Sequence, residues 1–188
     1  DVIQLALTEE RFSYHGEVYD LPPPGIPDRG GTVQELTLVP RPLHPFETWQ
    51  AITSPPTLEQ VPRRGWGGVF WNNHPTFTKR NWDRFAEVFE EVHGRTLEPG
   101  EKRTLVRCVC VADTREEAMA RVRPGHDEMW KFLGPYGWSK GYMGPDGKPA
   151  KAGLIPSLEE SLEQKIWIVG SADEVGEQIE WYRDLLGV

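Results

Sequence analysis

Thr53 and Ser54 are the first residues whose types and position could do chemistry. They end a segment rich in aromatic and β-branched residues, 45–53, and the run SPPT that begins at Ser54 is typical of a helix start. Hydroxyl groups and the free backbone N–H groups of a helix N-terminus can together bind a phosphate. The same side chains can also serve only as a helix cap, so the residue pattern leaves both roles open.

Trp71 and Arg107 are two further candidates, each in an apolar segment. Trp71 ends the segment 67–71, and active sites lie at the carboxyl ends of barrel strands, although core packing explains this residue equally well. Arg107 stands within the apolar stretch 104–112, where a buried guanidinium is costly unless an anion meets it. It could instead lie near a strand end and extend to solvent or to a carboxylate.

The remaining reactive side chains show no pattern of a metal or nucleophilic site. The five histidines are far apart in the chain, and none forms a zinc-binding pattern with cysteine. Cys108 and Cys110 alternate within a predicted strand, so we expect reduced core thiols and no disulfide. Asn72 and Asn73 could bind a ligand, but a turn is the favoured interpretation. We predict no metal site and no Rossmann or P-loop nucleotide site, and the pattern identifies no catalytic side chain.

The elements that must position these residues alternate between helix and strand. Apolar periodicity predicts a helix over 2–8 and short strands over 12–19 and 35–39. Further along, it predicts a strand over 45–53, a helix over 57–64, a strand over 67–71, a helix ending at His93, a strand over 104–112 with a helix after it, a strand over 166–170 and a helix after Ser171. Strands that alternate with helices favour parallel βα units and an α/β fold.

Two stretches rich in proline and glycine, 21–41 and 124–156, interrupt this alternation. The first predicts a long surface loop. The second predicts an insertion with short helical pieces, whose aromatic side chains could cover a substrate or fill a small core of their own. Only about three core strands remain, whereas a closed (β/α)₈ barrel needs eight and typically about 250 residues. We therefore expect one domain over residues 1–188 that is not a whole barrel.

Composition narrows the class of protein. The chain has 188 residues, of which 38% are hydrophobic and 27% charged, as expected for an ordinary folded domain. A net charge of −8 makes binding to nucleic acid or to anionic lipid a poor prediction. Its apolar runs are too short to predict a membrane span, and neither end resembles a signal peptide. Together with the expected reduced thiols, this favours a cytoplasmic protein.

A series of segments, in order along the chain, resembles the bacterial luciferase-like monooxygenases. The likeness begins with SYHGEVY, PRPLHP and TSPPTLEQVPRRGW, and continues with VCVADTREEA and VGSADEVGEQI. Each motif is weak by itself, but the order and the spacing hold over most of residues 8–187.

The resemblance implies the later half of a flavin-binding barrel. The fold would be α/β, a partial TIM (β/α)₈ barrel with long Pro/Gly-rich insertions, in which the early strands and the last strand have no counterpart. Thr53 and Ser54 match the family's loop that meets the flavin near its phosphate, which implies that they bind the cofactor. Trp71 matches a strand-end tryptophan on the substrate side, and Arg107 matches an arginine directed to an anionic substrate or to the flavin.

The resemblance also implies an activity and partners. We expect a flavin-dependent monooxygenase that uses reduced FMN (FMNH2) and O2 to oxidise a small organic substrate, with the flavin providing the reactive chemistry. Two alternatives remain open, namely a hydride-transfer enzyme that uses the deazaflavin F420, and a non-catalytic flavin-binding or structural subunit. A flavin reductase and a second copy of the chain are the partners expected in addition to the substrate.

Overall fold

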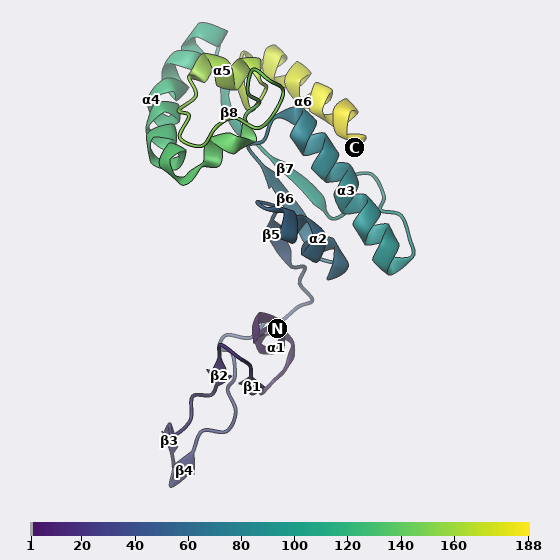
Figure 1. Ribbon diagram of the computed structural model, residues 1–188, viewed down its shortest axis with the longest axis vertical. Helices are drawn as coiled ribbons and strands as arrows, with labels where there is room; N and C mark the ends of the chain where they lie inside the picture. Colours follow the sequence, from purple (N-terminus) through teal and green to yellow (C-terminus); the bar gives the residue numbers. More distant parts are fainter. Residues whose placement is uncertain (1) are drawn as a thin grey trace. The chain divides into compact units, whose positions relative to one another are not determined.

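The computed structural model describes residues 2–188, which fall into two compact units divided after Phe46 (Figure 1). The first unit holds the residues up to Phe46, and the second holds Glu47–Val188. Each unit is described by itself below. The expectation of a single domain over 1–188 stays a prediction.

The first unit has little regular structure beyond its first helix. Helix α1 (Val2–Thr8) confirms the predicted helix. The expected strand over 12–19 is wrong in extent, because the chain turns back at Gly16, and β1 (Tyr14–His15) pairs antiparallel with β2 (Asp20–Leu21). A second short hairpin joins β3 (Pro27–Asp28) to β4 (Gly31–Thr32). The strand expected over 35–39 is reduced to one bridge between Leu36 and Phe12, since proline and glycine dominate the surrounding stretch.

The second unit contains a parallel sheet with the strand order β5-β6-β7. Its strands are β5 (Trp49–Ala51), β6 (Gly67–Trp71) and β7 (Arg103–Val106), and both pairings are parallel. They are joined by α2 (Pro55–Arg63) and α3 (Pro75–His93), so the predicted βα units are confirmed. Strand β5 is shorter than the expected 45–53. Helix α2 begins two residues before the expected start, because two prolines occupy its first turn, where a missing N–H costs nothing.

The strand expected over 104–112 is interrupted at Arg107. Strand β7 ends at Val106, and β8 (Cys108–Val111) pairs parallel with β9 (Trp167–Gly170) and not with β6. The one predicted strand therefore belongs to two sheets. Arg107 lies between β7 and β8 and belongs to neither strand. Its guanidinium donates to the Tyr182 hydroxyl and to the Asn73 carbonyl.

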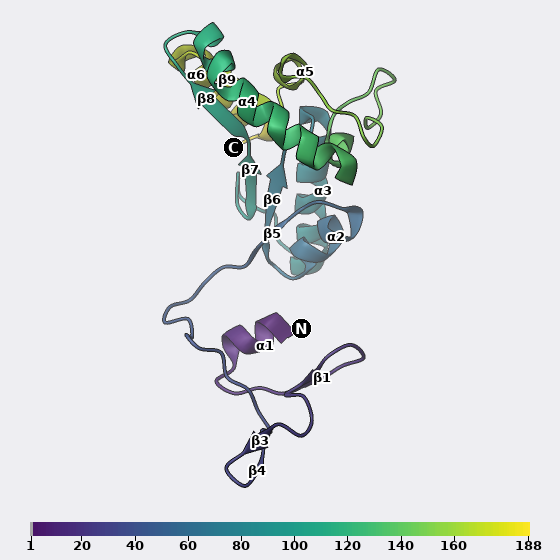
Figure 2. The same ribbon diagram turned by 90° about the vertical axis from the view of Figure 1, so that its left-hand side faces the viewer.

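Helix α4 (Arg115–Leu133) continues through Pro124, where we expected irregular structure to begin. A proline inside a helix removes one backbone hydrogen bond, but the buried side chains of Ala118, His126 and Trp130 hold both halves of α4 against the neighbouring strands. Figure 2 shows α4 lying across β8 and β9. The short helical pieces expected within 124–156 are confirmed as η1 (Gly134–Tyr136) and η2 (Trp138–Gly141). Helix α5 (Leu158–Glu163), which lies just beyond that stretch, was not predicted.

Strand β9 lies between two hydrophobic clusters. On one face Ile168 packs with α6 (Ala172–Leu186) and with the side chains of α3. On the other face Trp167 and Val169 pack with α4 and with Tyr142. In contrast, Val109 and Val111 of β8 remain half exposed, so part of this parallel sheet has an uncovered face.

Candidate functional site

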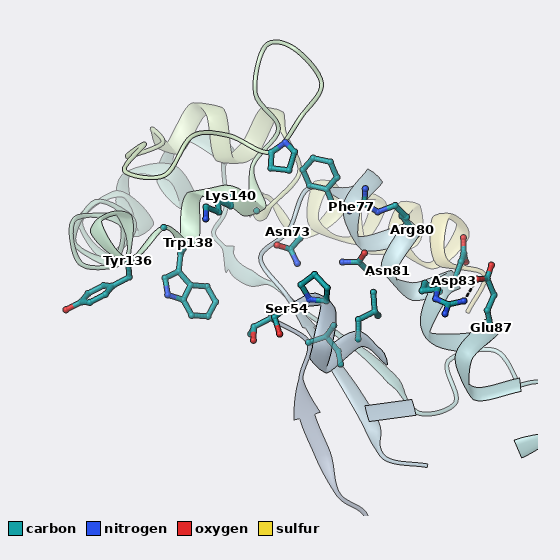
Figure 3. A pocket seen from close by; sticks show the side chains of 18 residues that line it. Ser54, Asn73, Phe77, Arg80, Asn81, Asp83, Glu87, Tyr136, Trp138 and Lys140 are labelled. Carbon is teal, nitrogen blue, oxygen red and sulfur yellow. Dashed lines mark hydrogen bonds and ion pairs between the residues drawn. The ribbon is translucent and has the colours of Figure 1, made fainter. Parts of the chain in front are cut away.

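A cavity of about 910 Å³ lies beyond the carboxyl ends of β5 and β6 (Figure 3). One side is formed by the β5–α2 connection, including Thr53 and Ser54, and another by Asn73 and α3. The insertion after α4 supplies the wall opposite, with Tyr136, Trp138 and Lys140. The loops that follow the carboxyl ends of parallel strands lie together at one edge of the sheet. The cavity lies at this edge, which is the usual position of ligand sites in α/β proteins.

Ser54 is the N-cap of α2 and forms a capping box with Thr57. The Thr57 backbone N–H donates to Ser54 Oγ at 3.4 Å, and Thr57 Oγ1 accepts from the Ser54 N–H at 3.1 Å and from the Thr53 N–H at 3.2 Å. The capping role that the sequence suggested is therefore present. The three N–H groups are all used in these contacts, and Thr53 and Ser54, but not Thr57, line the edge of the cavity. Thr57 was not recognised from the sequence, although its place three residues after Ser54 is the signal of a capping box.

Trp71 approaches the cavity only through another tryptophan. It is the last residue of β6 and is half buried, and its ring meets Trp138 edge to face, with the centroids 5.1 Å apart. Trp138 lines the cavity, whereas Trp130 and Tyr142 of the same insertion pack in the second hydrophobic cluster. The aromatics therefore form no separate core of their own, because Trp130 and Tyr142 join the cluster around β9. A role of Trp138 in covering a substrate stays a prediction.

Asn72 confirms the turn that was favoured after β6. Its backbone φ is +45°, and its side chain is only 4% exposed. Neither the amide nitrogen nor the amide oxygen reaches a hydrogen-bond partner among residues 2–188. The amide lies near the thiol of Cys108. Burial raises the pKa of that thiol, while Asn72 and the charge of Arg107 oppose the rise, so the group stays protonated and is a poor nucleophile.

The guanidinium of Arg107 donates hydrogen bonds to hydroxyl and carbonyl oxygens of the protein. Nε donates to the Tyr182 hydroxyl at 3.1 Å, and one terminal nitrogen donates to the Asn73 carbonyl at 2.8 Å and to Thr78 Oγ1 at 3.2 Å. The other terminal nitrogen donates to the Val106 carbonyl. Burial lowers the pKa of the guanidinium, but the group remains far from neutral. The partners of Arg107 among residues 2–188 are hydroxyl and carbonyl groups, so the alternative of a carboxylate partner is not observed.

The structure does not bring all four predicted residues into one cavity. Thr53 and Ser54 line the cavity described above, and Trp71 contacts its wall. Arg107 lines a separate apolar groove beside β7 and α6, and it reaches the first cavity only through the Asn73 carbonyl. In the part of the chain that the structure describes, no group of His, Cys, Asp or Glu side chains is arranged to hold a metal ion.

Comparison with known families decides the relationship. The family model for luciferase-like monooxygenases matches residues 1–188. The chain belongs to this family. A search of curated proteins found no match.

Solved structures agree with the fold of this luciferase-like monooxygenase chain. One is the oxygenating constituent of 3,6-diketocamphane monooxygenase from the CAM plasmid of Pseudomonas putida, solved in complex with FMN, with 22% identity and a TM-score of 0.66 over 95% of this chain and 49% of that one. Another is the monooxygenase RslO1 from Streptomyces bottropensis, with 17% identity and a TM-score of 0.65 over 99% of this chain and 49% of that one. An F420-dependent secondary alcohol dehydrogenase matches with 13% identity and a TM-score of 0.59, over 98% of this chain and 50% of its own.

These matches confirm the α/β partial luciferase-like fold. The chain spans about half the length of the solved structures that it matches. Within residues 2–188 no helix is long and apolar enough to cross a membrane.

Proposed function

We propose that this luciferase-like chain forms the flavin-phosphate end and one wall of the active site in a flavin-dependent monooxygenase. The enzyme would use reduced FMN and O2 to oxidise a small organic substrate. The observation that carries the proposal is the position of Thr53 and Ser54, whose hydroxyl-bearing side chains line the edge of a large cavity at the N-terminus of α2. The FMN complex of the Pseudomonas putida relative supports this choice of cofactor.

The residues fit such a cofactor in size and in chemistry. The cavity of about 910 Å³ is large enough for a flavin mononucleotide, and its wall offers the flat ring of Trp138. Arg80 and Lys140 place two positive charges in the lining of the cavity, although the net charge of the chain is −8. Positive side chains at this position favour the binding of a dianionic phosphate. When bound, the reduced flavin supplies the reaction with oxygen. The chain's own contribution is to bind the phosphate, hold the ring system and exclude water.

The remaining site residues have narrower proposed roles. Trp71, which supports Trp138, would contact the substrate side of the cofactor. Arg107 would act on an anionic substrate with the donor capacity that its four protein contacts leave free. A flavin reductase would supply reduced FMN, and we propose pairing with a second copy of the chain, since the uncovered sheet face needs a cover.

Replacing Ser54 with alanine tests the phosphate assignment. We expect the dissociation constant for FMN to rise about tenfold, because hydrogen bonds to a charged group contribute about 1.5 kcal/mol. The dissociation constant for riboflavin, which lacks the phosphate, should not change. Fluorescence titration of both flavins measures the two effects.

The matched control is Ser171→Ala. Ser171 caps α6 with the same kind of capping box, but it does not line the cavity. Both variants should lose about 1 kcal/mol of stability. The phosphate assignment is wrong if the two variants bind FMN equally well, or if Ser54→Ala weakens riboflavin as much as FMN.

A hydride-transfer enzyme is the second candidate function, supported by the match to the F420-dependent dehydrogenase. Parallel titrations with FMN and F420 decide between the cofactors. We expect FMN to bind at least ten times more tightly. Tighter binding of F420 would favour hydride transfer, and the absence of binding to either would favour the non-catalytic subunit.

A further inference from the structure

The cavity wall formed by the insertion ends directly at a buried tyrosine. Residues 136–141 supply the wall, and Tyr142 follows with no exposed surface. Its ring meets Trp130 of α4 edge to face, with the centroids 5.0 Å apart. Because Tyr142 is adjacent in sequence to the wall, whatever holds its side chain also limits the movement of Trp138 and Lys140.

A chain of hydrogen bonds leads from Tyr142 into the core. The Tyr142 hydroxyl lies 2.7 Å from Ser161 Oγ on α5, and Ser161 Oγ lies 2.7 Å from His126 Nε2 on α4. His126 Nδ1 meets the Asp127 carboxylate at 3.0 Å. Tyr142, Ser161 and His126 have no exposed surface, so water does not compete for these bonds. We call these four residues the Tyr142 anchor.

Ser161 Oγ is the centre of the anchor, with one proton and three partners. Besides Tyr142 and His126 it contacts the Ser157 carbonyl, to which its hydroxyl can donate at 2.9 Å. Both of these acceptors, the Ser157 carbonyl and an imidazole nitrogen, compete for the one Ser161 proton, so the Tyr142 hydroxyl is the donor in its bond to Ser161. The Ser157 carbonyl also accepts from the Ser161 backbone N–H at 3.1 Å. Asp127, at the far end of the chain of bonds, has a half-exposed side chain.

The order Ser161–His126–Asp127 is also that of an acyl-transfer triad, but burial excludes this use. A nucleophilic serine has to reach a substrate carbonyl, and Ser161 is fully enclosed by α4, α5 and the insertion. The Tyr142 anchor instead connects the helices α4 and α5 to the segment that lines the cavity.

We infer that the Tyr142 anchor is a positioning device that holds the insertion wall, with Trp138 and Lys140, against the proposed flavin cavity. The inference rests on the proposed function for its ligand. Burial raises the pKa of the Tyr142 hydroxyl, which therefore remains a donor at neutral pH. The wall is also held where the His74 N–H donates to the Gly141 carbonyl at 2.7 Å, so loss of the anchor should loosen the wall without unfolding it.

The test is a double-mutant cycle with Tyr142→Phe and Ser161→Ala. Each variant removes one hydroxyl and keeps the surrounding packing. Hydrogen exchange followed by mass spectrometry should show faster exchange in peptides covering 137–150, where the Ala150 N–H donates to the Tyr142 carbonyl. The dissociation constant for FMN should rise about fivefold in each single variant, and no further in the double variant, because each single variant already breaks the Tyr142–Ser161 bond that connects the wall to the core.

Ser171→Ala again serves as the control, since it lowers global stability but lies outside the anchor. It should leave both the exchange of 137–150 and the affinity for FMN unchanged. Unchanged exchange in both Tyr142→Phe and Ser161→Ala, or strictly additive effects in the double variant, would overturn the inference. If the unmodified chain does not bind FMN, the proposed function fails, and the exchange data alone still decide whether the anchor holds the wall.

Discussion

Replacing Arg107 with methionine is expected to lower the free energy of unfolding by about 3 kcal/mol. Methionine keeps most of the apolar stem, but it removes the hydrogen bonds to Tyr182, Thr78 and the Asn73 carbonyl. Tyr182 on α6 and Thr78 on α3 would lose a donor in a partly buried space, and the Asn73 carbonyl in the β6–α3 loop would keep only its bond from Thr78 Oγ1. Urea denaturation followed by far-UV circular dichroism measures the loss.

Arg121→Met is the matched control for this prediction. Arg121 is an exposed helix residue that pairs with Glu117 one turn away, so its replacement should cost about 0.5 kcal/mol or less. Equal losses for the two variants would show that Arg107 contributes no more than a surface charge. A variant that is destabilised but still binds flavin and substrate would limit Arg107 to a structural role.

Phe85→Ala is expected to cost about 3–5 kcal/mol, the range for removing a large aromatic side chain from a core. Phe85 on α3 has no exposed surface, and its ring meets Phe70 of β6 with the centroids 5.9 Å apart. The ring also fills the space above Gly68, where even a Cβ atom would come within 2.7 Å of it. The cavity left behind would separate α3 from the sheet.

The control for Phe85 is Val92→Ala on the same helix. Val92 is 44% exposed, so its truncation should cost less than about 1 kcal/mol. Thermal unfolding of the three proteins compares the losses. A loss for Phe85→Ala that is no larger than that for Val92→Ala would contradict the described packing of α3.

The βα order could be predicted from the sequence because it depends on local signals. The apolar period of α3, the Ser54 cap and the alternation around Cys108 are all contained in short windows. The break at Arg107 could not be predicted, since the two halves of the stretch pair with strands far apart in the sequence, and Arg107 itself bonds to Tyr182, a residue 75 positions later. The continuation of α4 through Pro124 likewise depends on tertiary packing, which overrides the local preference.

The candidate site was predictable to a similar degree. Thr53 and Ser54 were identified because a helix start after a strand has a recognisable pattern. The wall residues Trp138 and Lys140 carry no such pattern. They belong to the cavity only because the insertion folds back across the strand ends, where contacts from distant parts of the chain hold it. A single sequence contains no local signal for such contacts.

The position of β9 between the two hydrophobic clusters has a consequence for the order of folding during synthesis. The first cluster needs Ile168 and the second needs Trp167 and Val169, yet these residues are made more than a hundred positions after β5. Neither cluster can close while the ribosome is still adding the insertion. The second unit should therefore leave the exit tunnel as an open chain with exposed apolar segments, and become compact in a late step once 166–170 have emerged.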